Sequence, residues 1–325
     1  MSAPAQASAG GERPRLVALV GPTAGGKTEL AVALALRLDA EIVSVDSRQV
    51  YRRLDVGTAK PDRAARAAVP HHLLDVVEPD RSFDAARFAT LGRAAVADVV
   101  ARGKSVLLCG GSGLYLRALT EGLCPAPPAD AAIRAVLAAE LAVRGVAALH
   151  DELRAHDPAA AARIAPRDAV RITRALEVQR LTGRPLSEWQ QAHAFTDRPY
   201  DVLVLVLCPP AEELEARIAR RAAAMWDGGL IAETEAVLAA GFAPTLRPLQ
   251  AIGYREAQQF LRGELDRAAA LEQIRLATRQ YAKRQRTWFR ALPDATWLDG
   301  SESVESIVQR VDVFLERGAD AAHLS

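Results

Sequence analysis

Cysteine is scarce in this chain of 325 residues, and no two cysteines form a C-x-x-C pair. Cys109, Cys124 and Cys208 are odd in number and lie far apart. This spacing is typical of reduced thiols in a cytoplasm, and it excludes a zinc site built from cysteine. The adjacent His71 and His72 have no third ligand at a suitable spacing, so we expect both to have structural roles.

The chain also lacks a large charge of one sign and a long apolar run. Its formal net charge is +1, so a nucleic acid would have to bind local basic patches rather than the field of the whole molecule. The first 15 residues contain no signal-peptide core, and no stretch is apolar enough to span a membrane. Half of the residues are hydrophobic and a quarter are charged. We therefore expect a globular cytoplasmic protein that does not bind a membrane.

A glycine-rich loop is the most informative stretch that the sequence does contain. Residues 21–28 read GPTAGGKT and match the G-x-x-x-x-G-K-T pattern of a phosphate-binding loop. An apolar run at 16–20 precedes the loop, and leucines recur after it at Leu30, Leu34 and Leu38. This order predicts a strand, a loop and a helix that point backbone N–H groups at one anion. The correct flanks disfavour an ordinary glycine-rich turn.

Two side chains of this loop predict a metal-assisted phosphate site. Lys27 would place a positive charge beside the phosphate, and Thr28 would offer its hydroxyl to a phosphate-bound Mg²⁺. Mg²⁺ is therefore the expected cofactor. The loop alone leaves the phosphate compound open, because a triphosphate such as ATP and an allylic diphosphate present the same oxygens.

Two further strand ends are expected to face the loop. The segment 41–46 reads as a buried strand that ends in Asp46, and residues 105–109 read as another that ends in the glycine turn 110–113. Ligands gather at the carboxyl ends of parallel strands, so Asp46 and the turn hydroxyl of Ser112 are candidate substrate contacts. The alternatives are that Asp46 caps a turn and that the glycine turn only joins a strand to a helix. Asp46 is the only acid that we place at such a strand end.

The predicted secondary structure changes twice along the chain, from an α/β pattern to an all-helical pattern and back. Pro125, Pro127 and Pro128 end the first α/β part, alanine-rich helical patterns follow, and an apolar strand pattern resumes at 202–207. The expected fold class is therefore α/β, a parallel sheet of the P-loop NTPase type flanked by helices, with an inserted all-helical domain. We expect a disordered leader over residues 1–14, a core domain over 15–123 and 198–316, a helical insertion over 124–197 and a flexible tail over 317–325.

Arginines gather at two places between the loop and residue 230. Arg167, Arg171 and Arg174 share one face of a predicted helix in the insertion, where a solvated surface is an equal alternative. Arg221 belongs to an arginine cluster in the helix predicted at 212–225, and it is a candidate second contact to a diphosphate.

A third basic cluster lies nearer the carboxyl end of the chain. No acid occurs between Glu272 and Asp294, and the aromatic residues Tyr281, Trp288 and Phe289 are interleaved with the cations. The cations are Arg275, Arg279, Lys283, Arg284, Arg286 and Arg290, and all of them except Arg284 fall on one side of a predicted helix. Such a basic stripe is of the kind that follows a phosphate backbone, and the alternative is a solvated helix face.

Seven motifs occur in order along the chain; they are GPTAGGKT, SVDSRQVYR, GTAKP, PHHLLD, GGSGLYLRAL, QAIGYRE and AKRQRTWFR. With this combination, over residues 17–298, the chain resembles the tRNA dimethylallyltransferases, also called tRNA isopentenyltransferases, of the bacterial type without a zinc-finger tail. Two positions depart from the family pattern. Gly25 stands where serine is usual, and Ser112 stands where threonine is frequent.

The resemblance implies a reaction. A dimethylallyl group would move from dimethylallyl diphosphate to N6 of the adenosine on the 3′ side of the anticodon in tRNA, and the loop would hold that diphosphate rather than ATP. Asp46 would accept a proton from the amine, which Ser112 would help to position. Lys27, Mg²⁺ and Arg221 would meet the negative charge of the leaving diphosphate.

The resemblance also implies binding roles. The diphosphate would contact Gly21, Pro22, Thr23, Ala24, Gly25, Gly26, Lys27, Thr28 and Arg221. The anticodon stem-loop of tRNA would contact Asp46, Ser47, Arg48, Gln49, Ser112, Arg134, Arg167, Arg171, Arg174, Gln250, Gly253, Tyr254, Arg255, Arg279, Lys283, Arg284 and Arg286. We expect a monomer. The alternatives are an isopentenyltransferase of free adenine nucleotides, a P-loop kinase, and an RNA-binding protein with an inactive loop.

Overall fold

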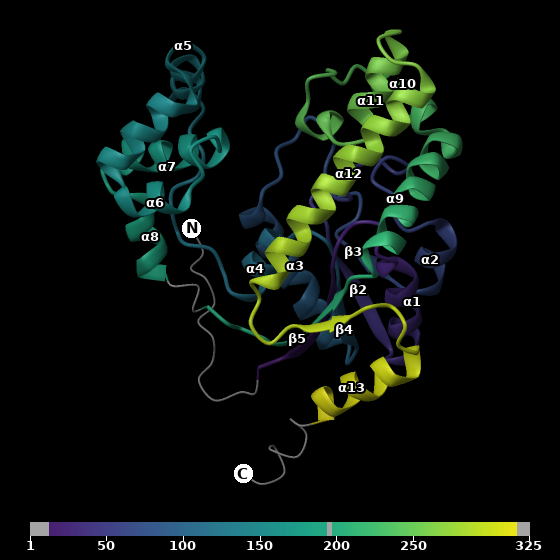
Figure 1. Ribbon diagram of the computed structural model, residues 1–325. Coiled ribbons are helices and arrows are strands. Elements are labelled where there is room, and N and C mark those ends of the chain that lie inside the picture. Colours follow the sequence, from purple (N-terminus) through teal and green to yellow (C-terminus); the bar gives the residue numbers. More distant parts are fainter. Residues whose placement is uncertain (1–12, 194–196, 317–325) are drawn as a thin grey trace. The chain divides into compact units, whose positions relative to one another are not determined.

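The computed structural model describes residues 13–193 and 197–316 (Figure 1). Most of the predicted leader, residues 1–12, and the predicted tail, residues 317–325, lie outside the described residues. Contacts divide the chain into two compact units. These are the sheet unit, formed by the segments up to Thr120 and from Pro199 onward, and the helical unit, Glu121–Arg198.

The sheet unit is built on a six-stranded parallel sheet with the strand order β3-β2-β4-β1-β5-β6. The strands are β1 (Arg15–Val20), β2 (Ala40–Val45), β3 (His71–His72), β4 (Ser105–Gly110), β5 (Asp201–Leu207) and β6 (Thr296–Leu298). The four longer strands lie where the apolar runs predict them, and the predicted α/β class with a parallel sheet is confirmed. The sequence analysis predicts neither β6 nor β3, because strands of three and two residues show no recognisable pattern.

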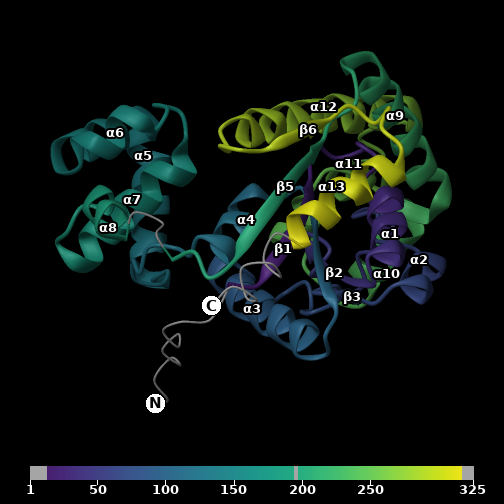
Figure 2. The same ribbon diagram turned by 90° about the horizontal axis from the view of Figure 1, so that it is seen from below.

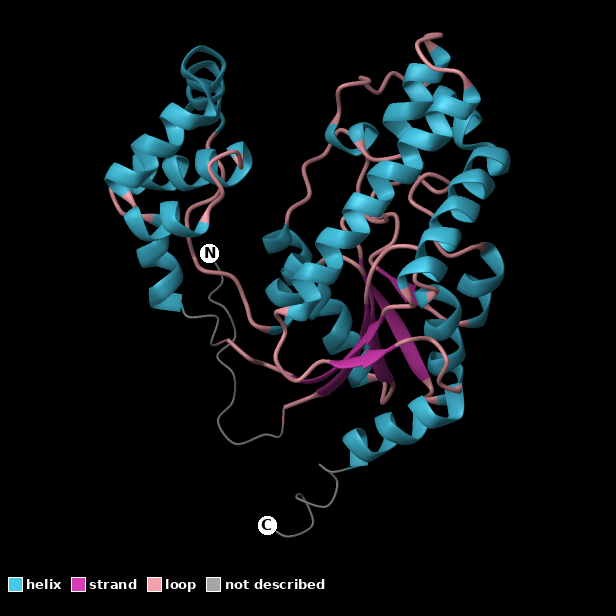
Figure 3. Cartoon of the chain, viewed as in Figure 1, coloured by secondary structure: helices cyan, strands magenta, loops and turns pink. Residues whose placement is uncertain are grey.

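Helices enclose this sheet, as the magenta strands and cyan helices of Figure 3 show. Those that pack on its faces are α1 (Lys27–Arg37), α3 (Ala85–Ala101), α4 (Gly113–Thr120) and α13 (Val304–Glu316), and the short helix α2 (Arg63–Ala68) contacts α1. The helices α1 and α13 share an apolar cluster with the strands that includes Val17, Leu34, Leu107 and Ile307, whereas α3 and α4 lie on the other side of the sheet (Figure 2). Because both faces are covered, β1 is apolar and buried almost throughout, and every residue of β2 is buried.

A second group of helices extends from the carboxyl edge of the sheet, at the upper right of Figure 1. It comprises α9 (Ala211–Met225), a π-helical turn (Trp226–Leu230), α10 (Ile231–Ala239), a 3₁₀ turn (Arg247–Gln250), α11 (Tyr254–Leu261) and α12 (Arg267–Arg290). Arg275 of α12 forms an ion pair with Glu215 of α9, which ties the two long helices together. Among the described residues, no helix has the length and apolarity needed to cross a membrane.

The helical unit has its own apolar core. Its helices are α5 (Ala131–His156), α6 (Pro158–Arg163), α7 (Ala169–Thr182) and α8 (Leu186–His193). Leu137, Leu149, Ile172 and Leu176 are buried together between α5 and α7. Aspartates cap three of the helices: the side chains of Asp130, Asp157 and Asp168 each accept a hydrogen bond from a backbone N–H of the first turn.

One helix boundary corrects a prediction. Because the Asp168 carboxylate caps α7 by accepting from Arg171 N at 3.1 Å, the helix begins at Ala169. Arg167 therefore lies before the helix and does not share a helical face with Arg171 and Arg174. The arginine pattern at i, i+4 and i+7 includes a residue outside the helix.

A buried carboxylate joins β2 to the neighbouring elements. Glu41 is 6 % exposed. Its Oε2 accepts hydrogen bonds from Arg102 Nη2 at 2.8 Å and lies 2.7 Å from His72 Nε2, while Arg102 Nη1 contacts its other oxygen. His71 Nδ1 lies 2.8 Å from the Val69 carbonyl oxygen. Both histidines thus have partners within the fold.

The variant Glu41→Gln tests this ion pair. Arg102, with His72, holds the pKa of Glu41 at about 2 instead of 4.5. The contribution of the carboxylate to stability is therefore fully present above pH 4.5 and is lost as the pH falls toward 2. We expect the variant to lose about 2 kcal/mol of unfolding free energy at pH 7 and to approach the wild type in strong acid. Urea unfolding at several pH values measures this, and a loss that is the same at every pH would contradict the ion pair.

Candidate active site

The register of the parallel strands brings three chain segments to one edge of the sheet. Val20 and Val45 both pair with Gly110, and Val20 also pairs with Val206. The residues that follow these positions leave the sheet at the same level. The phosphate loop, the Asp46 turn and the second glycine turn therefore start side by side, as the sequence predicts.

The phosphate loop leads directly into α1, whose first residue is Lys27. Lys27 Nζ donates to the carbonyl oxygens of Gly21 at 3.1 Å and Pro22 at 2.7 Å, so its ammonium lies inside the loop. Gly25 N donates to Pro22 O at 3.2 Å and closes the turn. The Thr28 hydroxyl makes no hydrogen bond to another described residue.

Two cations at this edge have little negative charge opposite them. Burial lowers the pKa of Lys27 to about 8, and Arg221, Asp46 and Glu29 act on it through space. Burial also lowers the pKa of Arg221, and Asp46 and Glu29 oppose that shift. Arg221 forms no hydrogen bond or ion pair with another described residue. Its neighbour on α9, Arg217, is instead bonded to Gly25 O and to Glu213. Two poorly neutralised cations beside a glycine loop have the chemistry that suits an anion with several oxygens.

Asp46 both caps a turn and faces this site. Its Oδ1 accepts from Arg48 N at 2.7 Å and from Gln49 N at 3.3 Å. No described residue donates to Oδ2, so this oxygen is available to a substrate proton. Ser112 Oγ accepts from Ser47 N at 3.0 Å, which places the Ser112 hydroxyl beside the same turn.

Gln285 of α12 is a site residue that the sequence analysis misses. Its Oε1 accepts from Thr23 N at 2.8 Å, and its Nε2 donates to Gly111 O at 2.9 Å. The amide thus connects the phosphate loop with the second glycine turn. Gly111 allows this approach, because a Cβ there would lie 2.2 Å from Gln285 Nε2. The available signal is a polar residue on the buried side of α12, between Ala282 and Phe289, since buried polar groups need partners.

Several predicted RNA contacts are engaged inside the sheet unit. Tyr254 is fully buried, and its hydroxyl donates to Glu233 Oε1 at 2.5 Å, so its ring and hydroxyl are engaged within the fold and do not support the predicted RNA contact. The Gln49 side chain donates to Ala59 O at 3.1 Å and accepts from Ser44 Oγ at 3.0 Å.

The other predicted RNA contacts, near the Asp46 turn and in the QAIGYRE motif, differ in how far they are exposed. Gly253 is buried as the residue before α11, and Gln250 is exposed. Arg255 is exposed and pairs with the buried carboxylate of Glu256. Arg48 Nη1 donates to the carbonyl oxygen of Arg247 at 3.3 Å. Arg48, Gln250 and Arg255 therefore stay candidate RNA contacts.

The basic stripe on α12 divides into two parts. Arg275 pairs with Glu272 at 2.7 Å and with Glu215, and Arg279 Nε lies 3.5 Å from Glu215 Oε2. Although residues 273–293 contain no acid, Glu215 of α9 neutralises part of the positive charge at the start of the stripe. Lys283 and Arg284 are exposed and form no ion pair with another described residue. Arg286 is half-buried, and its Nε has no hydrogen-bond partner among the described residues.

The arginines of the helical unit are also unequal. Arg134 and Arg174 bind the same buried carboxylate, Glu177, at 2.9 and 2.8 Å. Arg171 Nε lies 3.5 Å from Asp168 Oδ2 and is exposed, as is Arg167. Arg134 and Arg174 thus hold the unit together, whereas Arg167 and Arg171 present their guanidinium groups to solvent.

A family model described as IPP transferase matches residues 49–292. The chain belongs to the IPP transferase family. A "tRNA dimethylallyltransferase" of Anaeromyxobacter dehalogenans (strain 2CP-C) is 53% identical over 298 residues, which cover 92% of this chain and 99% of the relative. Another with that name, from Stenotrophomonas maltophilia (strain R551-3), is 50% identical over 313 residues, which cover 94% of this chain and 99% of the relative. The family predicted from the seven motifs is confirmed.

Solved structures of this family share the fold. The full-length tRNA isopentenylpyrophosphate transferase of Bacillus halodurans superposes with a TM-score of 0.70 at 37% identity, over 96% of this chain and 100% of that one. A eukaryotic dimethylallyltransferase acting on tRNA gives a TM-score of 0.72 at 27% identity, over 85% of this chain and 70% of that one.

The charge state of Lys27 gives a test of the anion site. In the free protein Lys27 loses its proton as the pH rises through about 8, and with it the charge that attracts a diphosphate. The Kd for dimethylallyl diphosphate should therefore rise above pH 8, by up to about tenfold per pH unit. In Lys27→Arg the Kd should stay constant over that range, because arginine keeps its proton. Calorimetry between pH 7 and 9.5 measures both proteins. A wild-type Kd that does not change, or an equal rise in both proteins, would exclude Lys27 as the titrating contact.

Proposed function

We propose that the chain transfers the dimethylallyl group of dimethylallyl diphosphate to N6 of the adenosine on the 3′ side of the anticodon in tRNA. The products are diphosphate and N6-(dimethylallyl)adenosine. One observation carries the proposal. In a chain of the IPP transferase family, a carboxylate with a free oxygen, Asp46, acts through space on Lys27 and Arg221 at one edge of the sheet. Alkylation of an amine by an allylic diphosphate needs a proton acceptor beside a site for the leaving anion.

The proposed step balances in protons and electrons. The N6 lone pair forms a bond to the allylic C1 as the bond from C1 to the diphosphate oxygen breaks, and that electron pair leaves with the diphosphate. The alkylated amine then loses its proton to Oδ2 of Asp46. Because Oδ1 stays bonded to Arg48 N and Gln49 N, the turn is held while the proton moves. Ser112, whose Oγ is fixed by Ser47 N, would orient the amine.

The leaving diphosphate would be held by the loop residues 21–28 together with Arg221. Mg²⁺, when bound, would neutralise part of the diphosphate charge, and the Thr28 hydroxyl with phosphate oxygens forms a donor set that suits this hard cation. Among the described residues, no three His, Cys, Asp or Glu side chains are grouped to hold a metal. The cation would therefore arrive with the diphosphate.

The RNA would be bound through exposed cations. A stacked adenosine must be extruded to reach Asp46, which costs a few kcal/mol of unstacking that contacts to the anticodon stem-loop offset. Lys283 and Arg284 on α12 and Arg167 and Arg171 in the helical unit supply unshared or exposed positive charge for the phosphate backbone. A tRNA substrate would place the protein in the cytoplasm, where its three free cysteines would stay reduced. We expect it to act as a monomer.

The variant Asp46→Asn tests the proton acceptor. Its amide oxygen can still accept from the turn N–H groups, so diphosphate and tRNA should bind normally. Single-turnover transfer from labelled dimethylallyl diphosphate to tRNA should fall by about 10²–10⁴-fold. A rate within threefold of the wild type would mean that another group takes the proton. In the same assay the wild type should label tRNA and leave AMP unlabelled. In a separate assay, turnover of ATP without any use of dimethylallyl diphosphate would indicate a kinase instead.

The double variant Lys283→Ala with Arg284→Ala tests the RNA contact of α12. Each neutralised phosphate releases counterions, so the log–log salt dependence of tRNA affinity should become shallower by about one to two units. The affinity for dimethylallyl diphosphate should not change. The matched control is Arg37→Ala with Lys104→Ala, which removes two cations from exposed ion pairs away from the site. An unchanged slope in the folded α12 variant would assign RNA binding to the helical unit.

A further inference from the structure

Three of the seven motifs supply no group to the proposed reaction. These are GTAKP, PHHLLD and QAIGYRE. One residue from each motif, Lys60, Asp75 and Tyr254, contacts or lies against a single stretch of chain, residues 51–61, which follows the Asp46 turn. We call this stretch the support segment. Its contacts explain what these motifs do.

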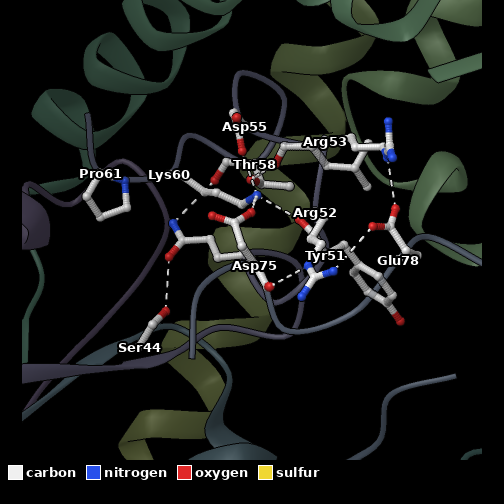
Figure 4. Close-up of polar contacts among 12 residues, drawn as sticks. Ser44, Tyr51, Arg52, Arg53, Asp55, Thr58, Lys60, Pro61, Asp75 and Glu78 are labelled. Carbon is white, nitrogen blue, oxygen red and sulfur yellow. Dashed lines mark hydrogen bonds and ion pairs between the residues drawn. The ribbon is translucent and has the colours of Figure 1, made fainter. Parts of the chain in front are cut away.

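Lys60 of the GTAKP motif holds the support segment from within. Its side chain is 1 % exposed, although it carries a charge. Nζ donates to Tyr51 O at 2.6 Å, to Asp55 Oδ1 at 2.6 Å and to Asp75 Oδ1 at 2.5 Å. Figure 4 shows Lys60 reaching toward Asp55 and Asp75. All three ammonium protons are used, so the cation is fully paired and joins both ends of the segment to the PHHLLD motif.

Glu233 of α10 holds the same segment from outside. Its Oε2 accepts from Asp55 N at 2.7 Å and Val56 N at 2.8 Å, and its Oε1 accepts from Gly57 N at 3.1 Å. Three successive backbone N–H groups thus surround one carboxylate, as in an anion-binding nest. Tyr254 of the QAIGYRE motif donates to the same Oε1. Gly57 permits this, because a Cβ there would lie 2.4 Å from the Tyr254 ring.

Gln49 connects the support segment to the Asp46 turn. Its Nε2 donates to Thr58 O at 3.4 Å and to Ala59 O at 3.1 Å. Its own backbone N–H is one of the two groups that Asp46 Oδ1 accepts. A displacement of the support segment would therefore pull on the side chain of Gln49 and reorient Asp46.

The support segment borders an open space. A hollow of about 470 Å³ borders it, with Asp55, Lys60 and Pro61 in its lining. Side chains of neighbouring elements do not fill that space. The polar contacts of Lys60 and Glu233 restrain residues 55–60 together with the backbone bonds from Ala59 N to Val56 O and from Lys60 N to Asp55 O.

We propose that Lys60 and Glu233 are positioning residues for the transfer reaction. They fix the support segment, which holds Gln49 and through it keeps the free oxygen of Asp46 aligned with the acceptor amine. This inference rests on the proposed function. Neither residue touches a substrate, so both act on the chemical step and not on diphosphate binding.

Two variants and one control test the inference in the full chain. Lys60→Met removes the ammonium but keeps a chain of similar length. Glu233→Gln is milder, because one amide oxygen can still accept hydrogen bonds. Lys104→Met is the matched control, since Lys104 binds both oxygens of Asp39 in an ion pair remote from the site. The measurements are kcat with both substrates saturating, the Kd of dimethylallyl diphosphate, and the melting temperature.

We expect kcat to fall by about 10- to 100-fold in Lys60→Met and by a smaller factor in Glu233→Gln, since small displacements of reacting groups are costly. The diphosphate Kd should stay within twofold of the wild type, and Lys104→Met should keep its kcat. Hydrogen exchange at residues 55–57 should accelerate in Glu233→Gln.

Two results would overturn the inference. Variants that stay folded at the assay temperature with an unchanged kcat would show that the network only stabilises the fold. A loss of diphosphate affinity as large as the loss of kcat would place its effect on the phosphate loop. In both cases an active wild type leaves the proposed function intact. A wild type that transfers nothing to tRNA would instead overturn the proposed function, and this inference with it.

Discussion

Val20, Val45 and Gly110 end three neighbouring parallel strands at one level of the sheet, and the chemistry of the site depends on this register. A slip of one residue in any strand would turn its side chains to the opposite face and move the following loop along the edge. The register is fixed because both faces of these strands are buried under helices. The apolar core therefore determines the distance between the phosphate loop and Asp46, although no core residue takes part in the reaction.

The same edge carries an unbalanced charge. Lys27 and Arg221 are both desolvated, and the pKa of each is lowered by burial. The protein supplies carbonyl oxygens to Lys27 and no hydrogen-bond partner from the described residues to Arg221. A fold selected for stability alone would pair or remove these cations. In the proposed reaction their cost would be offset when a diphosphate binds, so that binding would also neutralise both charges.

Contiguous motifs could be predicted from the sequence, and partners from distant segments could not. The strand, loop and helix around Lys27 are encoded by local spacing, and so are the four longer strands. Gln285 meets Thr23 across 262 positions of sequence, and Glu233 meets residues 55–57 from another helix. Nothing near either residue signals its partner. For the same reason the sequence suggested that Tyr254 contacts RNA, whereas the structure buries it.

The basic residues of helix α12 have two different roles. At its start Arg275 and Arg279 face the carboxylate of Glu215, so positive charge there fixes the helix to α9. Farther along, Lys283 and Arg284 are exposed, while Gln285, on the buried side of the same turn, bonds the phosphate loop and the second glycine turn. The pairing at the start ties α12 to α9, and adjacent residues farther along present charge outward and an amide inward. A basic run in the sequence is thus part scaffold and part exposed charge, and the acids of the neighbouring helix decide which cations are paired.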